Sequence, residues 1–107
     1  MSELHYSVYV IELDKEVLNK NKFREENPNY KEGMPCVYVG MTGLPVEKRF
    51  ENHKAGIKSS RMVKNFGKEL MPELYEEYNP MDSWTAPKKE RELAEELRSQ
   101  GYGVWQK

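Results

Sequence analysis

Three stretches of the chain have the apolar, β-branched and aromatic content that is typical of β-strands. LHYSVYVIEL spans residues 4–13 and CVYVGM spans residues 36–41. The first is long enough to be a central strand. ELMPELY spans residues 69–75, and we expect Pro72 to confine it to a sheet edge or a bulge, because proline has no N–H to donate to a neighbouring strand.

Two further segments are predicted to be helices by their first and last residues. Residues 45–55 begin with a proline and are followed by Gly56. Residues 86–100 follow Thr85, a candidate N-cap, and precede Gly101. Proline suits the first turn of a helix, where its missing N–H costs nothing, and glycine suits the residue after the last turn.

The remaining segments have weaker patterns. Residues 14–34 form a long polar connection, with Asp14 as a candidate N-cap of a weak helix. A short helix is expected after Ser60, which is its candidate cap, and residues 76–84 are expected to be a loop. The C-terminal tail YGVWQK, residues 102–107, contains Trp105, which we expect to pack back on the core.

The composition predicts one compact domain over residues 1–107, because 107 residues with 37% hydrophobic content build a single core. The net charge is only −1, so any nucleic-acid-binding surface must be local. Cys36 is the single cysteine, which excludes an internal disulfide and indicates a buried, reduced thiol in a cytoplasmic protein. No signal-like N-terminus and no apolar run of membrane-spanning length is present, so we expect no membrane partner.

One carboxylate falls on the apolar side of the last predicted helix. Glu90 shares an arc of the helical wheel with Leu93, Ala94 and Leu97. A buried carboxylate needs a cation or hydrogen-bond donors to compensate its charge, which makes Glu90 a candidate metal ligand or acid/base group. Alternatively, this end of the helix extends beyond the core and Glu90 is solvated beside its basic neighbours.

The helix at 45–55 carries two polar side chains beside its apolar stripe. His53 lies among Val46, Phe50 and Ile57 on the wheel, and Arg49 lies at the border one turn earlier. A histidine in such a place is either a core residue or a functional group. Arg49 is either part of a surface ion pair or a group that stabilises phosphate charge.

Two tyrosines are candidates for one shared face of the sheet. Tyr9 lies on the Ser7 face of the first strand, and Tyr38 lies on the Cys36 face of the second. Gly40 follows on the same face, and a strand glycine often marks a close approach by backbone or ligand. Taken alone, the tyrosines are also common strand residues.

A local basic stretch follows the second predicted helix. Between residues 54 and 68 the chain has no acidic residue. We expect this stretch, together with Lys48 and Arg49, to carry any affinity for nucleic acid, and that affinity should depend on salt. Its basic residues are Lys54, Lys58, Arg61, Lys64 and Lys68.

The order of these motifs resembles the GIY-YIG nuclease family. The series is Ser7-Val8-Tyr9, Tyr38-Val39-Gly40, Arg49, His53 and Glu90. The resemblance implies an α+β fold with a small three-stranded antiparallel sheet flanked by helices. It also implies metal-dependent hydrolysis of DNA phosphodiester bonds, with Mg²⁺ or Mn²⁺ as a weakly bound cofactor.

Site roles follow from the resemblance by position. Glu90 corresponds to the metal-binding carboxylate, Arg49 to the phosphate-stabilising arginine, and Tyr9 and Tyr38 to the motif tyrosines, one of which assists deprotonation of the attacking water. His53 corresponds to a histidine found in part of the family.

The chain departs from the family pattern in two places. Ser7 replaces the first glycine, and residues 14–34 form an unusually long insertion, which is either a substrate-specific flap or decoration. The alternative function is a non-catalytic module on the same scaffold that binds nucleic acid or protein. No feature of the sequence sets an oligomeric state.

Overall fold

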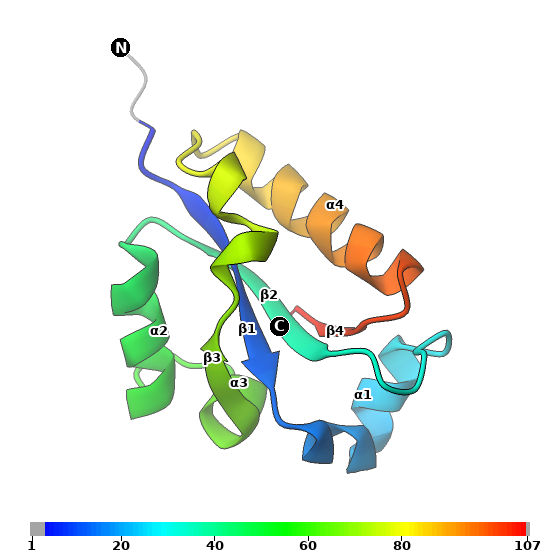
Figure 1. Cartoon of the computed structure of the whole chain (residues 1–107). Coiled ribbons are helices and arrows are strands. Elements are labelled where there is room, and N and C mark those ends of the chain that lie inside the picture. Colours follow the sequence, from blue (N-terminus) through cyan, green and yellow to red (C-terminus); the bar gives the residue numbers. More distant parts are fainter. Residues whose placement is uncertain (1–3, 107) are drawn as a thin grey trace.

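The computed structural model describes residues 4–106 and contains one mixed β-sheet with helices packed around it (Figure 1). The sheet has four strands in the order β3-β1-β2-β4. The strands are β1 (Ser7–Leu13), β2 (Cys36–Thr42), β3 (Gly67–Leu70) and β4 (Gly103–Trp105). The α-helices are α1 (Asn21–Glu26), α2 (Val46–Ala55), α3 (Arg61–Phe66) and α4 (Thr85–Ser99), and the 3₁₀ turns are η1 (Lys15–Asn19), η2 (Pro72–Leu74) and η3 (Glu76–Tyr78).

The expected α+β class is confirmed, but the expected three-stranded antiparallel sheet is wrong. β4 adds a fourth strand that pairs parallel with β2. It has only three residues and contains a glycine, so it is too short to show a strand pattern in the sequence. β3 also lies earlier than residues 69–75, because Pro72 begins η2. The expected loop at 76–84 contains η3.

Strand register places the two motif tyrosines on one face of the sheet. β1 and β2 are antiparallel, with Tyr9 opposite Gly40 and Ile11 opposite Tyr38. β4 places Trp105 beside Tyr38. Since directly paired residues project to the same side, Tyr9, Tyr38 and Trp105 share a face. The opposite face is also inside the protein, because the five valines on it are fully buried, Val8, Val10, Val37, Val39 and Val104.

Helices cover the sheet from several sides. α2 and α3 lie beside β1 and β3, and α4 packs along β2 and β4 (Figure 1). The expected helix ends at Gly56 and Gly101 are confirmed, with φ of 82° and 98° in the left-handed region that favours glycine. The expected cap at Thr85 is wrong. Asp82 performs that role, since its carboxylate accepts the backbone N–H groups of Trp84 and Thr85.

The polar segment 14–34 is part of the core. Asp14 accepts the Glu16 N–H, as expected of an N-cap, although the turn that follows is 3₁₀. Val17 and Phe23 are fully buried, and the Phe23 ring stacks on Trp105 with centroids 6.2 Å apart. The expected packing of the C-terminal tryptophan is thereby confirmed, and its partner comes from this segment.

Two asparagine side chains complete the hydrogen bonding of strand residues that have no neighbouring strand on one side. Asn79 accepts the Val8 N–H at 2.9 Å and donates to the Val8 carbonyl at 2.8 Å. Asn27 accepts the Val104 N–H at 2.8 Å and donates to the Val104 carbonyl at 3.0 Å. Each amide therefore satisfies a backbone donor and a backbone acceptor that no strand pairs with, at Val8 of β1 beyond the end of β3 and at Val104 of the edge strand β4. Unpaired groups at these places would otherwise be costly.

Within residues 4–106, no helix is long and apolar enough to cross a membrane.

Replacing Asn27 tests whether this amide holds β4 in the sheet. We expect Asn27→Ala to lower the free energy of unfolding by about 2 to 4 kcal/mol, because buried backbone groups of β4 lose their partner. Urea unfolding followed by circular dichroism measures the change. Asn29→Ala is the control, since Asn29 is exposed, and should change the free energy by less than about 0.5 kcal/mol. Equal effects of the two variants would contradict the assignment.

Candidate functional site

The Tyr9 ring lies directly against the backbone of Gly40. A Cβ atom at position 40 would come within 2.7 Å of Cζ and Oη of Tyr9. The Tyr9 side chain is only 1% exposed, so its ring cannot move outward without leaving the core. Gly40 therefore marks a close approach, and the group that approaches is the Tyr9 phenol.

His53 joins helix α2 to this tyrosine. Its Nε2 lies 2.8 Å from Tyr9 Oη, and its Nδ1 accepts the Ser60 backbone N–H at 3.2 Å. Because Nδ1 is an acceptor, the ring proton resides on Nε2 and is donated to the Tyr9 oxygen. Burial and the nearby Arg49 lower the His53 pKa to about 4. The imidazole is thus neutral at pH 7, which agrees with this tautomer.

Tyr38 lies beside both residues and closer to the surface. Its ring centroid is 6.1 Å from that of Tyr9 and 5.4 Å from that of His53, edge-on in both cases. The side chain is 7% exposed, whereas His53 has no exposed area. Burial, with a further contribution from Glu90, raises the pKa of the Tyr38 phenol, and Arg49 opposes that rise. Glu90 and Arg49, which carry opposite charges, therefore shift the pKa of the Tyr38 phenol in opposite directions.

Arg49 is held by the loop that follows α2. Its Nη2 donates to the Lys58 carbonyl at 2.9 Å and its Nη1 to the Ile57 carbonyl at 3.4 Å. The guanidinium has five N–H donors, so several stay available to another ligand. Arg49 is half-buried rather than part of a surface ion pair. The expected burial of Ile57 is wrong, because it follows the helix end at Gly56 and is 54% exposed.

Glu90 is a half-buried carboxylate on α4. Desolvation raises its pKa, and Arg91 offsets part of that rise. The described residues contain one ion pair, Arg98 with Glu26, so Glu90 has no cationic partner within 4.0 Å among them. Lys89 instead lies over the Tyr78 ring, 3.7 Å from its centroid. The alternative in which Glu90 pairs with its basic neighbours is therefore not observed.

A metal ion at Glu90 would have few protein ligands. No group of three or more His, Cys, Asp or Glu side chains in residues 4–106 is placed to hold a metal. A single partly desolvated carboxylate nevertheless fits a hard divalent cation, since Mg²⁺ commonly uses one or two carboxylates together with water and substrate phosphate oxygens. Glu90 would be that ligand.

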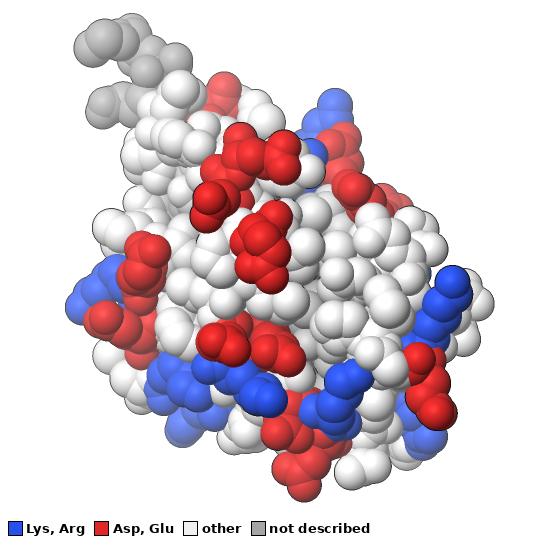
Figure 2. All heavy atoms as spheres, in the orientation of Figure 1, with Lys and Arg blue, Asp and Glu red and all other residues white. Residues whose placement is uncertain are grey.

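The predicted nucleic-acid-binding residues are all exposed. Lys54 is engaged, because its ammonium donates to the Gly67 carbonyl at 2.6 Å. Figure 2 shows one face of the molecule, where basic and acidic side chains are interspersed and acidic ones gather in the upper half, over η2 and η3. The positions of the predicted set are α2 for Lys48 and Lys54, the following loop for Lys58, α3 for Arg61 and Lys64, and β3 for Lys68.

The sequence did not reveal the role of the loop between α2 and α3. Ser60 was expected to cap α3 with its side chain, but it makes no capping hydrogen bond. The backbone N–H of Ser60 instead donates to His53 and so sets its tautomer. Earlier in the same loop, the carbonyls of residues 57 and 58 accept hydrogen bonds from Arg49. Lys58 adopts a positive φ of 47°, the one non-glycine residue in residues 4–106 to do so. Because these contacts use backbone N–H and carbonyl groups, the side-chain types in the loop did not predict them.

Comparison with protein-family models, with curated proteins and with solved structures found no match to this chain.

Gly40→Ala tests the close approach of Tyr9. We expect it to lower the free energy of unfolding by about 1 to 3 kcal/mol, because the new methyl group must displace the buried phenol. Gly43→Ala is the matched control, since its Cβ would lie 3.4 Å from the nearest Tyr6 atom, an ordinary contact. Urea unfolding measures both. If the two substitutions cost the same, the close approach is not a constraint.

The pH dependence of stability tests the neutral state of His53. The folded pKa of about 4 lies below the unfolded value of 6.5, so the unfolded state takes up the proton first. Stability should fall as the pH drops from 6.5 towards 4, by about 2 to 3 kcal/mol from this residue. Urea unfolding at pH 7.5 and 4.5 should show this loss in the wild type beyond that in His53→Gln.

A second measurement covers the case in which His53→Gln does not fold. Proton NMR of the wild type should show the His53 ring neutral at pH 5.5. A protonated ring at that pH would contradict the assignment.

Proposed function

We propose that this protein is a metal-dependent endonuclease that hydrolyses DNA phosphodiester bonds. The supporting observation is that Arg49 and Glu90, from two different helices, both act electrostatically on Tyr38. Both groups affect the pKa of that phenol, in opposite directions, yet they form no ion pair with each other among the described residues. An arginine with spare N–H donors and a carboxylate without an ion-pair partner, both acting electrostatically on one phenol, are groups of the kind that phosphoryl transfer uses.

Each residue then has a role that follows from its burial. Arg49, half-buried with spare N–H donors, would bind the equatorial phosphate oxygens as charge develops on them. Tyr38 would orient the attacking water through its oxygen, because its raised pKa keeps the phenol protonated. Tyr9 and His53 are buried, so they are positioning residues that hold Tyr38 and α2.

Glu90 would hold Mg²⁺ or Mn²⁺ with oxygen ligands completed by water and the substrate. The cation supplies positive charge that neutralises the leaving oxygen and lowers the pKa of bound water. Its binding without nucleic acid should be weak, because the chain contributes one carboxylate. DNA would be drawn to the exposed basic residues of α2, α3 and β3, and a cytoplasmic location stays a prediction.

A non-catalytic nucleic-acid-binding module is the second candidate. It is favoured by the burial of Tyr9 and His53, since their contacts are explained by packing alone. It has no use for the unpaired, half-buried carboxylate of Glu90, whose desolvation is a cost that a catalytic ligand would justify.

Plasmid cleavage with Mg²⁺ or Mn²⁺ tests the enzyme. We expect Arg49→Ala and Glu90→Ala each to reduce the cleavage rate by about 100-fold or more, as loss of one charge-stabilising group does in other sites. Lys88→Ala and Glu92→Ala are the matched controls, because both residues are exposed on α4, and they should stay within about twofold of wild type. Circular dichroism checks that each variant is folded.

The outcomes separate the two functions. Undiminished cleavage by both Arg49→Ala and Glu90→Ala would overturn the site. A salt-dependent shift of DNA mobility with no cleavage under either metal would favour the binding module.

A further inference from the structure

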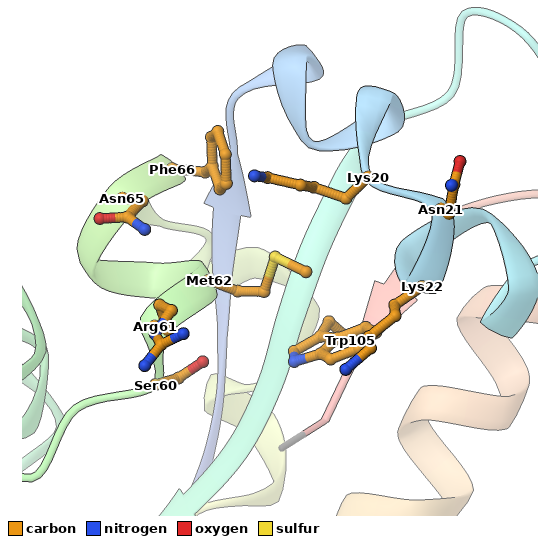
Figure 3. Close-up of a pocket in the computed structure, with 9 residues that line it drawn as sticks. All are labelled: Lys20, Asn21, Lys22, Ser60, Arg61, Met62, Asn65, Phe66 and Trp105. Carbon is orange, nitrogen blue, oxygen red and sulfur yellow. The ribbon is translucent and has the colours of Figure 1, made fainter.

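A pocket of about 480 Å³ lies between α3, the segment η1–α1 and the end of β4 (Figure 3). Its volume falls in the range of small-molecule sites. It combines two kinds of side chain. The cationic ones are Lys20, Lys22 and Arg61, and the apolar ones are Met62, Phe66 and Trp105.

The pocket has an aromatic wall. The Trp105 ring is half-buried and backed on one side by Phe23, at 22° between the ring planes. Figure 3 shows Met62 extending towards Trp105 and Lys22 ending beside the indole. Lys20 reaches across the opening to the Phe66 ring, with its ammonium 5.8 Å from the centroid. A flat ring supported from behind is a stacking surface for another planar group.

The positive charge in the pocket is not compensated. No acidic side chain lines it, and none of its three cations forms an ion pair among residues 4–106, whose one ion pair is Arg98 with Glu26. Like charges held near one another are unfavourable unless an anion joins them. The pocket is therefore suited to a ligand that carries negative charge.

A buried hydroxyl at the pocket wall also lacks a partner. Ser60 lines the pocket, and its Oγ is the one buried side-chain nitrogen or oxygen atom in the described residues with no hydrogen bond. An unsatisfied buried hydroxyl costs free energy that a ligand atom can recover. A planar anion with additional polar atoms could stack on the aromatic wall, pair with the cations and hydrogen-bond to this hydroxyl.

We propose that the pocket binds one unpaired nucleotide, with its base stacked on Trp105 and its phosphate between Lys22 and Arg61. The inference rests on the proposed function in taking nucleic acid as the source. The pocket and the candidate site share the loop 56–60, whose carbonyls hold Arg49 and whose Ser60 forms the pocket wall. Trp105 is also the strand neighbour of Tyr38. A nucleotide in the pocket would thus lie next to the phosphodiester at the site.

Tryptophan fluorescence tests the pocket directly. The chain has two tryptophans, and Trp84 is 89% exposed. In the Trp84→Phe variant of this chain, Trp105 is the only tryptophan and therefore the only source of tryptophan emission. Thymidine monophosphate and an oligothymidylate of eight nucleotides are titrated in EDTA, so that no metal-dependent cleavage occurs. We expect both to quench Trp105, because a base stacks on its ring.

Substitution of the cations identifies where the ligand sits. In the Trp84→Phe protein, Lys22→Ala and Arg61→Ala should each raise the dissociation constant of the oligonucleotide about fivefold or more, since each removes a charged phosphate contact. Lys88→Ala is the control, as an exposed lysine on α4 outside the pocket, and should change it by less than twofold. The salt dependence should weaken in the first two variants and not in the control.

Each outcome decides the proposal. Quenching by both ligands, or by the oligonucleotide alone, supports binding of a nucleotide within nucleic acid. Quenching by the monophosphate alone supports the pocket but makes a free nucleotide the source. Absence of quenching by either ligand overturns it, as does quenching that Lys22→Ala and Arg61→Ala leave unchanged. Cleavage of duplex plasmid by the wild type is measured separately. If the wild type cleaves plasmid but Trp105 is not quenched, this inference is rejected and the proposed function stands.

Discussion

The hydrogen bond between His53 and Tyr9 is the contact on which the candidate site depends. It joins α2 to the central strand β1, and the close fit of Tyr9 on Gly40 fixes the phenol relative to β2. Once α2 is held in this way, Arg49 one turn earlier is brought towards the tyrosines. The same imidazole accepts the Ser60 N–H and so fixes the loop that holds the guanidinium. One neutral ring therefore sets the position of a helix, a phenol and a cation.

The candidate site has a buried, neutral interior and a partly exposed edge that carries the charged groups. His53 is neutral because burial and the neighbouring guanidinium both disfavour its protonation, so it adds no charge beside Arg49. Tyr38 forms the boundary between this interior and the partly exposed Arg49 and Glu90. Charges at such a boundary are less screened than fully exposed ones, and they do not carry the full desolvation cost of a buried pair. This arrangement suits groups that must meet a charged substrate.

Segment 14–34 has a larger part in the structure than its polar sequence indicates. Asn27 completes the hydrogen bonding of β4, and Phe23 supports Trp105 from behind. The same segment contributes Lys20 and Lys22 to the pocket beside α3. A long connection between two paired strands thus closes one edge of the sheet and forms a wall of a second candidate site. Neither description proposed for it from the sequence, a flap or decoration, covers its role in the core.

Linear sequence patterns were enough to predict the two long strands, the helices α2 and α4, the glycines that end them, and the position of His53 among apolar residues. These features depend on residue type and on spacings within one or two turns, which a linear pattern records. The folded structure was needed to place the fourth strand, the Asp82 cap, the exposed Ile57, the loop that holds Arg49 and the pocket around Trp105. The fourth strand and the pocket depend on groups far apart in the chain, such as Asn27 and Val104. The Asp82 cap and the Arg49 loop are local, but they depend on backbone geometry that residue type does not record. A strand of three residues is too short to show a periodic pattern of apolar positions. A backbone carbonyl is the same in every residue, so the sequence does not indicate which carbonyls accept hydrogen bonds.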